Sequence, residues 1–148
     1  MSLAPDGTND ATSDVCAAVR QVAANGGGVV RLADGVYHFY SSSAERIALH
    51  ISNHDQPATH PVFLPFVGVT NVSVVATNAT FVMHGEGLAI LLQRTKNVSF
   101  KGITVEWERP FFAQSTILGF ENGKTRVRFL PRDHVEVSDG RVVLVGED

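Results

Sequence analysis

Cysteine is almost absent from this sequence, since Cys16 is the only one among 148 residues. No disulfide can form within the chain, and no cysteine-based metal site is indicated. Basic runs are also missing, and the formal net charge is −3. Both features argue against nucleic acid and anionic membranes as partners. Long hydrophobic runs are absent too: the longest aliphatic stretch, Leu88 to Leu92, is far too short to span a membrane.

A recognisable signal peptide is lacking at the N-terminus. The start Met1–Leu3 precedes a turn-rich segment, residues 4–8 (Ala-Pro-Asp-Gly-Thr). This pattern is typical of an artificial start from which a leader has been removed. What the sequence does contain is an ordinary globular balance, with 44% hydrophobic and 18% charged residues.

A helix followed by two strands is predicted near the N-terminus. Val15, Val19 and Val22 recur at spacings of three and four, which gives one apolar stripe over about Thr12 to Ala24. The glycines at 26–28 should end this helix, because glycine tolerates the left-handed cap. Two β-rich segments follow at residues 29–32 and 36–39. Many folds could begin in this way.

An internal repeat indicates the fold class. The segment Val69–Val74 returns as Thr95–Phe100, so that Asn97 follows Asn71 by 26 residues. A fixed period of this size is typical of a solenoid, in which each repeat buries its apolar face against its neighbours.

The repeats carry the pattern of strands. Ile103, Val105 and Trp107 alternate with polar residues, as in a strand with one buried face. The sequence therefore predicts an all-β fold, a right-handed parallel β-helix whose N-terminal end is capped by the helix. The period also places Trp107 opposite Phe81 in the core, and we favour this interpretation over a sugar-stacking role for Trp107.

The repeated asparagines have a physical explanation. Successive coils bend at the same corner, and Asn tolerates the left-handed backbone that such a bend needs. Stacked Asn side chains can also hydrogen-bond along the solenoid. Asn71, Asn78 and Asn97 all match the N-glycosylation pattern as well. We favour corner residues, because two of the three hold the repeat position.

The region after Pro110 has a different character. Asn122-Gly123 and Asp139-Gly140 are strong hairpin dipeptides, and they predict an antiparallel meander of four strands. We expect residues 1–110 to form the first coils of the β-helix with its capping helix. Residues 111–148 should then be hairpins that begin a small inserted β-domain, barrel-like in character.

Five segments together resemble the opening of glycoside hydrolase family 110, bacterial exo-α-1,3-galactosidases. Two of them, residues 6–10 (Asp-Gly-Thr-Asn-Asp) and 26–30 (Gly-Gly-Gly-Val-Val), also occur in many pectin-lyase-like β-helices. Residues 61–65 (Pro-Val-Phe-Leu-Pro) are a third segment of the match. The more specific ones are residues 52–56 (Ser-Asn-His-Asp-Gln) and 105–110 (Val-Glu-Trp-Glu-Arg-Pro). The resemblance covers nearly all of the chain but only the N-terminal part of a family member.

This resemblance implies an enzyme that removes terminal galactose from glycans with inversion, by means of two carboxylates and without a cofactor. It also implies a β-helix interrupted by a small β-barrel. The acid and base would lie beyond Asp148, so no catalytic residue is assigned, and these 148 residues alone should be inactive. A carbohydrate is then the expected partner, and a secreted or periplasmic location is expected.

Glu106 and Glu108 are the first candidates for contact with substrate. They lie two apart on a predicted strand, so both should face outward with Cα atoms about 7 Å apart. Inverting glycosidases hold their carboxyl groups roughly 6.5–9.5 Å apart. A catalytic pair, a substrate-lining pair and a solvated face all stay open. Arg109 is the local partner for either acid and a further candidate.

Asn53, His54 and Asp55 are the remaining candidates, in the long segment between residues 41 and 65. They could orient sugar hydroxyls, or they could close an Asx-type turn on themselves. If they share a groove with the glutamates, they should lie on the same side of the solenoid. His60 adds a second histidine nearby, but no further ligand has suitable spacing, so we predict no metal site.

The other four histidines are interpreted as structural or exposed; they are His38, His50, His84 and His134. Two other functions remain open. A polysaccharide lyase with the same fold would need a Lys or Arg base and often calcium bound by clustered acids. A non-enzymatic carbohydrate-binding β-helix would lack the catalytic carboxylates.

Overall fold

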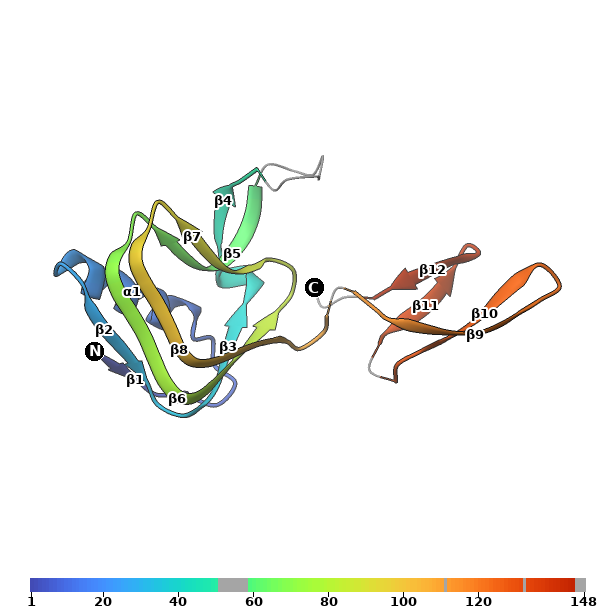
Figure 1. The fold of residues 1–148 in the computed structure, drawn as a ribbon, viewed down its shortest axis with the longest axis horizontal. Helices are drawn as coiled ribbons and strands as arrows, with labels where there is room; N and C mark the ends of the chain where they lie inside the picture. Colours follow the sequence, from blue (N-terminus) through green and yellow to red (C-terminus); the bar gives the residue numbers. More distant parts are fainter. Residues whose placement is uncertain (51–58, 111, 132, 146–148) are drawn as a thin grey trace.

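The computed structural model describes residues 1–50, 59–110, 112–131 and 133–145 (Figure 1), and within them the chain is mostly β. No helix in these ranges has the length and apolar character needed to cross a membrane. The elements are one α-helix, α1 (Thr12–Ala24), one 3-10 turn, η1 (Ser41–Ser43), and the strands β1 (Ser2–Leu3), β2 (Gly28–Leu32), β3 (Gly35–Tyr40), β4 (Glu45–Ala48), β5 (Thr59–Val67), β6 (Thr70–His84), β7 (Leu88–Gln93), β8 (Lys96–Trp107), β9 (Ser115–Glu121), β10 (Lys124–Phe129), β11 (Val135–Ser138) and β12 (Arg141–Leu144).

Helix α1 has the bounds that its apolar stripe predicts. Val15 and Val19 are buried against the core, at 1% and 3% exposure. The helix ends where the glycines begin: the N–H of Gly26 donates to the carbonyl of Ala23 over 3.0 Å, and the φ of Gly26 is 88°. A residue with a Cβ is strained at that dihedral, which is why glycine ends the helix here.

The largest sheet is built from parallel strands that are distant in sequence. β2 and β3 pair with successive halves of β6, and β8 pairs with β6 along its other edge, all in parallel. A second sheet pairs β5 with β7 in parallel and β4 with β5 in antiparallel orientation. Figure 1 shows β6 beside β8 on one side of this body and β5 with β7 on another. The sheets are therefore of mixed orientation.

The predicted period is confirmed for part of each repeat. Val72 lies opposite Val98, 26 residues later, and Leu64 on β5 lies opposite Ile90 on β7 with the same offset. The offset then falls to 24, because Phe81 lies opposite Val105.

The placement of Trp107 opposite Phe81 is therefore wrong. Trp107 lies opposite Met83, one row further along the same pair of strands. The cause is a difference in the corners: β6 turns through residues 76–78, whereas β8 turns through Gly102 alone. Trp107 is half-buried and packs against the core, so its assignment to the core is confirmed.

The interpretation of the repeated asparagines as corner residues is confirmed. Asn71 and Asn97 have φ values of 58° and 55°, and Nδ2 of Asn97 donates to Oδ1 of Asn71 over 2.8 Å. Gly27 holds the equivalent place one strand earlier, where a Cβ would overlap the backbone of Asn71. Asn78 lies at the second corner, and its N–H donates to the carboxylate of Asp34 over 2.9 Å.

The two predicted hairpins are present, but they do not form a four-stranded meander. β9 pairs with β10, and β11 pairs with β12, in two separate two-stranded antiparallel sheets among the described residues. Asn122 and Asp139 have φ values of 49° and 50°, and each precedes a glycine at 72°. These dihedrals match the turn that joins two-residue hairpins. Figure 1 shows both hairpins to one side of the stacked strands.

Candidate functional site

The outward face of β3, the second half of β6 and the second half of β8 carries the polar and aromatic groups of interest. We call this surface the histidine face, after His38 and His84. On β3, the inward side chains of Tyr37 and Phe39 are buried, whereas His38 and Tyr40, which alternate with them, are only partly covered. The period of two thus directs a polar set outward from strands whose other side forms the core.

Strand register arranges these groups in rows across three strands. His38 lies opposite Val82, which lies opposite Glu106. In the next row Tyr40 lies opposite His84. Glu108 continues that row, because its N–H donates to the carbonyl of Met83 over 3.0 Å, just beyond the end of β8.

His38 and His84 share a hydrogen bond on this face. Nδ1 of His38 lies 2.8 Å from Nε2 of His84, so one ring donates and the other accepts. Tyr40 stacks on His84 with ring centroids 4.3 Å apart and planes 8° apart. The phenol of Tyr40 donates to the carbonyl of Thr8 over 3.2 Å.

Asp10 fixes the strand end that carries His38 and Tyr40. It forms a parallel bridge to His38, and its carboxylate accepts from the N–H of Thr12 over 2.9 Å. Burial alone would raise the pKa of Asp10. Polar groups of Ser43, Thr12 and Tyr40, which favour the ionised form, outweigh burial and hold this pKa below its ordinary value.

The predicted contact residues fall into two groups. Glu106, Glu108 and Arg109 lie at the end of β8 and just after it, and all three are exposed. Among the described residues an ion pair lies between Arg20 and Glu45. The pairing of Arg109 with these acids stays a prediction.

Asn53, His54 and Asp55 lie outside the described residues, so their predicted place beside the glutamates stays a prediction. In the described ranges, no group of three or more His, Cys, Asp or Glu side chains could hold a metal ion. Burial raises the pKa of the Cys16 thiol, which disfavours its thiolate form. The chemistry available on the histidine face is hydrogen bonding by imidazole and carboxylate beside an aromatic stack.

The sequence did not identify His38, Tyr40 and His84 as a group. The usable signal was the alternation around Tyr37 and Phe39, which marks His38 and Tyr40 as outward. The repeat does not predict that they lie beside His84. Paired residues of β3 and β6 are 44 positions apart in sequence, as Val36 and Thr80 are, whereas the repeat is 26 residues long.

Comparison with known proteins places this chain among glycosidase relatives. No family model matches it. It is 33% identical to alpha-1,3-galactosidase B of Akkermansia muciniphila over 88% of the chain. It is 31% identical to alpha-1,3-galactosidase B of Parabacteroides distasonis over 80%, and 27% identical to alpha-1,3-galactosidase A of Shewanella woodyi over 76%.

The chain is therefore similar in sequence to the opening part of glycoside hydrolases. Its curated relatives are α-1,3-galactosidases, and the resemblance noted in its sequence is confirmed. The match lies in the N-terminal part of those proteins. The chain spans only about a fifth of their length, with shares of 17%, 20% and 19% for the three named relatives.

Proposed function

We propose that this chain is the opening part of an exo-acting α-1,3-galactosidase that hydrolyses terminal α-galactosyl bonds of glycans with inversion. The single observation that carries the proposal is the 33% identity over 88% of the chain to an alpha-1,3-galactosidase. The match covers 88% of the chain. It therefore includes β3, β6 and β8, even if all of the unmatched residues lie at one end of the chain. A secreted or periplasmic location belongs to the same proposal.

We further propose that the stacked strands begin a right-handed parallel β-helix. The parallel pairing of β6 with β8 and of β5 with β7 supports it, as does the offset of 26 residues that both pairs share. Asn71 and Asn97 support it as well, because they repeat one left-handed backbone bend on successive strands and their side chains are hydrogen-bonded to each other. In this proposal, residues 1–110 form the opening coils, and the hairpins after them begin a small inserted β-domain.

The histidine face is the surface that we assign to the sugar. Galactose presents hydroxyls that suit imidazole and carboxylate groups, and its C–H groups pack on aromatic rings. His38, His84 and Tyr40 lie in rows with Glu106 and Glu108, so both kinds of contact are available on one surface. Rigid strands position these groups, which keeps the entropy cost of binding low.

Glu106 and Glu108 contact substrate in this proposal, and the acid and base come from residues beyond Asp148. An inverting glycosidase needs one carboxyl group to protonate the leaving oxygen and a second to activate water on the opposite side of the ring. Both glutamates are exposed, and as alternate residues of the chain they face the same way. They are well placed for hydroxyl contacts and do not flank a sugar ring from two sides.

Hydrolysis by the full-length protein tests this function. We expect release of galactose from an α-1,3-linked galactose disaccharide, with slower or no release from the α-1,4 and α-1,6 isomers. Proton NMR during the first minutes should show β-galactose before mutarotation, as inversion requires. No release from any of the three disaccharides would contradict the proposal, and so would α-galactose as the first product.

A further inference from the structure

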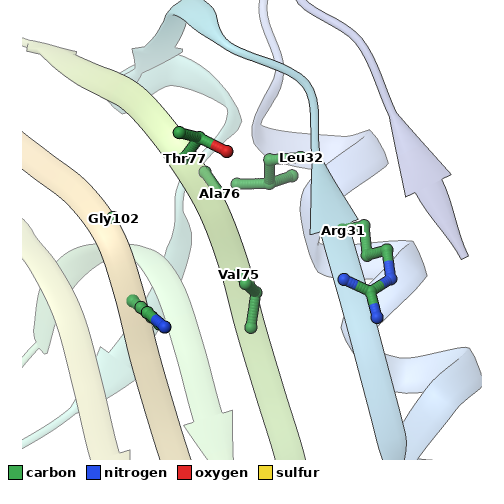
Figure 2. Close-up of a pocket in the computed structure, with 7 residues that line it drawn as sticks. Arg31, Leu32, Val75, Ala76, Thr77 and Gly102 are labelled. Carbon is green, nitrogen blue, oxygen red and sulfur yellow. The ribbon is translucent and has the colours of Figure 1, made fainter.

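A hollow of about 440 Å³ lies on the outer side of the large sheet, at the corner between the two halves of its strands. Its lining includes the side chains of Arg31, Val75, Thr77 and Lys101 and the residues Ala76 and Gly102. Figure 2 shows Arg31 on one strand, Val75 on the next and Gly102 on the strand beyond. This corner pocket is separate from the histidine face, which occupies the other half of the same strands.

The unequal corners shape this pocket. β6 passes the corner through three residues, whereas β8 passes it through Gly102 alone. The φ of Gly102 is 69°, and a Cβ there would overlap the carbonyl oxygen of Ala76. Only glycine therefore allows β8 to take this short path against β6. The longer corner of β6 lies beside this short one, and its residues Ala76 and Thr77 line the hollow.

The charge of the pocket is positive. Arg31, Val75 and Lys101 form one row, because Arg31 lies opposite Val75 and Val75 lies opposite Lys101. At the usual strand spacing the two cationic residues have Cα atoms about 10 Å apart. No carboxylate contributes to the lining, and among the described residues neither cation forms an ion pair. The nearby carboxylate of Asp34 already accepts the N–H of Asn78 over 2.9 Å.

We propose that the corner pocket binds an oxyanion substituent, a sulfate or a carboxylate, carried by a carbohydrate. The guanidinium of Arg31 can donate two parallel hydrogen bonds to such a group, and the ammonium of Lys101 can approach it from the other side. The apolar Val75 between them forms a floor, and the Thr77 hydroxyl is a further donor. The volume of about 440 Å³ suits a small ligand of monosaccharide size. The carbohydrate part of this inference rests on the proposed function; the oxyanion part does not.

Calorimetric titration of the full-length protein tests the proposal, with galactose 6-sulfate, galacturonate, galactose and sodium sulfate as probes. The variant Arg31→Gln/Lys101→Gln removes both charges from the pocket. The control Lys124→Gln/Arg126→Gln removes two exposed charges from the hairpin, so that the net charge changes equally. We expect the pocket variant to weaken galactose 6-sulfate or galacturonate binding roughly tenfold or more, because charge-assisted hydrogen bonds are lost. Galactose binding should be unchanged.

Each other outcome overturns part of the proposal. Equal weakening by both variants would mean a non-specific charge effect. No weakening by the pocket variant would remove the site. If sodium sulfate binds as tightly as galactose 6-sulfate, the pocket is a site for free anions, and the carbohydrate part of the proposal is wrong.

Hydrolysis of the neutral α-1,3-linked disaccharide by the pocket variant is measured in parallel. Unchanged hydrolysis shows that the variant is folded and separates this test from that of the proposed function.

Discussion

At the scale of the residue, the first corner of the stacked strands depends on left-handed backbone. Gly27, Asn71 and Asn97 occupy it in turn, with φ values of 113°, 58° and 55°. Glycine is required at the first position, where a Cβ would overlap Asn71. Asparagine serves at the other two because it tolerates this region and its amide can bond to the next copy.

Two substitutions of Asn97 separate these contributions. Asn97→Gly keeps the left-handed backbone and loses only the side-chain hydrogen bond, which should cost roughly 1 kcal/mol. Asn97→Ala loses the bond and also strains the backbone, which should add about 1–2 kcal/mol. Urea unfolding measures both differences. Equal stability of the two variants would show that backbone strain does not matter at this corner.

At the scale of the element, α1 and β3 are joined through Asp10. Its carboxylate accepts the N–H of Thr12 at the start of α1, and its backbone bridges to His38 on β3. One side chain thus fixes the helix start and the strand that carries the histidine face. Because hydrogen bonds to the ionised form hold its pKa below the ordinary 3.8, this stabilisation requires the ionised carboxylate.

The contribution of Asp10 should therefore depend on pH. It is fully present above the ordinary pKa of 3.8 and is lost as pH falls through the lower pKa of the folded state. At pH 7, Asp10→Ala should lower the free energy of unfolding by about 1 kcal/mol, as for one lost hydrogen bond. At pH 2 to 3 the difference from the unsubstituted protein should shrink. Asp14→Asn, an exposed change in the first turn of α1, is the control and should show no such trend.

The elements were largely predictable from sequence because their signals are local. The apolar stripe and the glycines predict α1, and Asn122-Gly123 and Asp139-Gly140 predict the hairpins. The position of Trp107 was not predictable, because corner length depends on a close backbone contact at Gly102 that leaves no periodic signal. Glu106 and Glu108 are outward, as their alternation predicts. The contact between His38 and His84 was not predictable, because the sequence offset between β3 and β6 differs from the 26-residue repeat.

At the scale of the whole molecule, one sheet carries two distinct outer surfaces. The histidine face holds His38, Tyr40 and His84 beside two glutamates, and the corner pocket holds two cations. Both lie on rigid parallel strands whose inner side is the core. The chain accounts for about a fifth of the length of its α-1,3-galactosidase relatives. In our proposal it supplies substrate contacts, and later residues supply the acid and base.

The most direct test of this account is the Michaelis constant of the full-length protein for the α-1,3-linked galactose disaccharide. Tyr40→Ala and Glu106→Gln should each raise KM roughly tenfold and change kcat much less, because they remove binding shared by the ground and transition states. Tyr40→Phe keeps the ring and should leave KM near its original value. Val29→Ala changes an outward residue of β2, away from the histidine face, and is the matched control. An unchanged KM for Tyr40→Ala and Glu106→Gln would contradict the assignment of this face to the sugar.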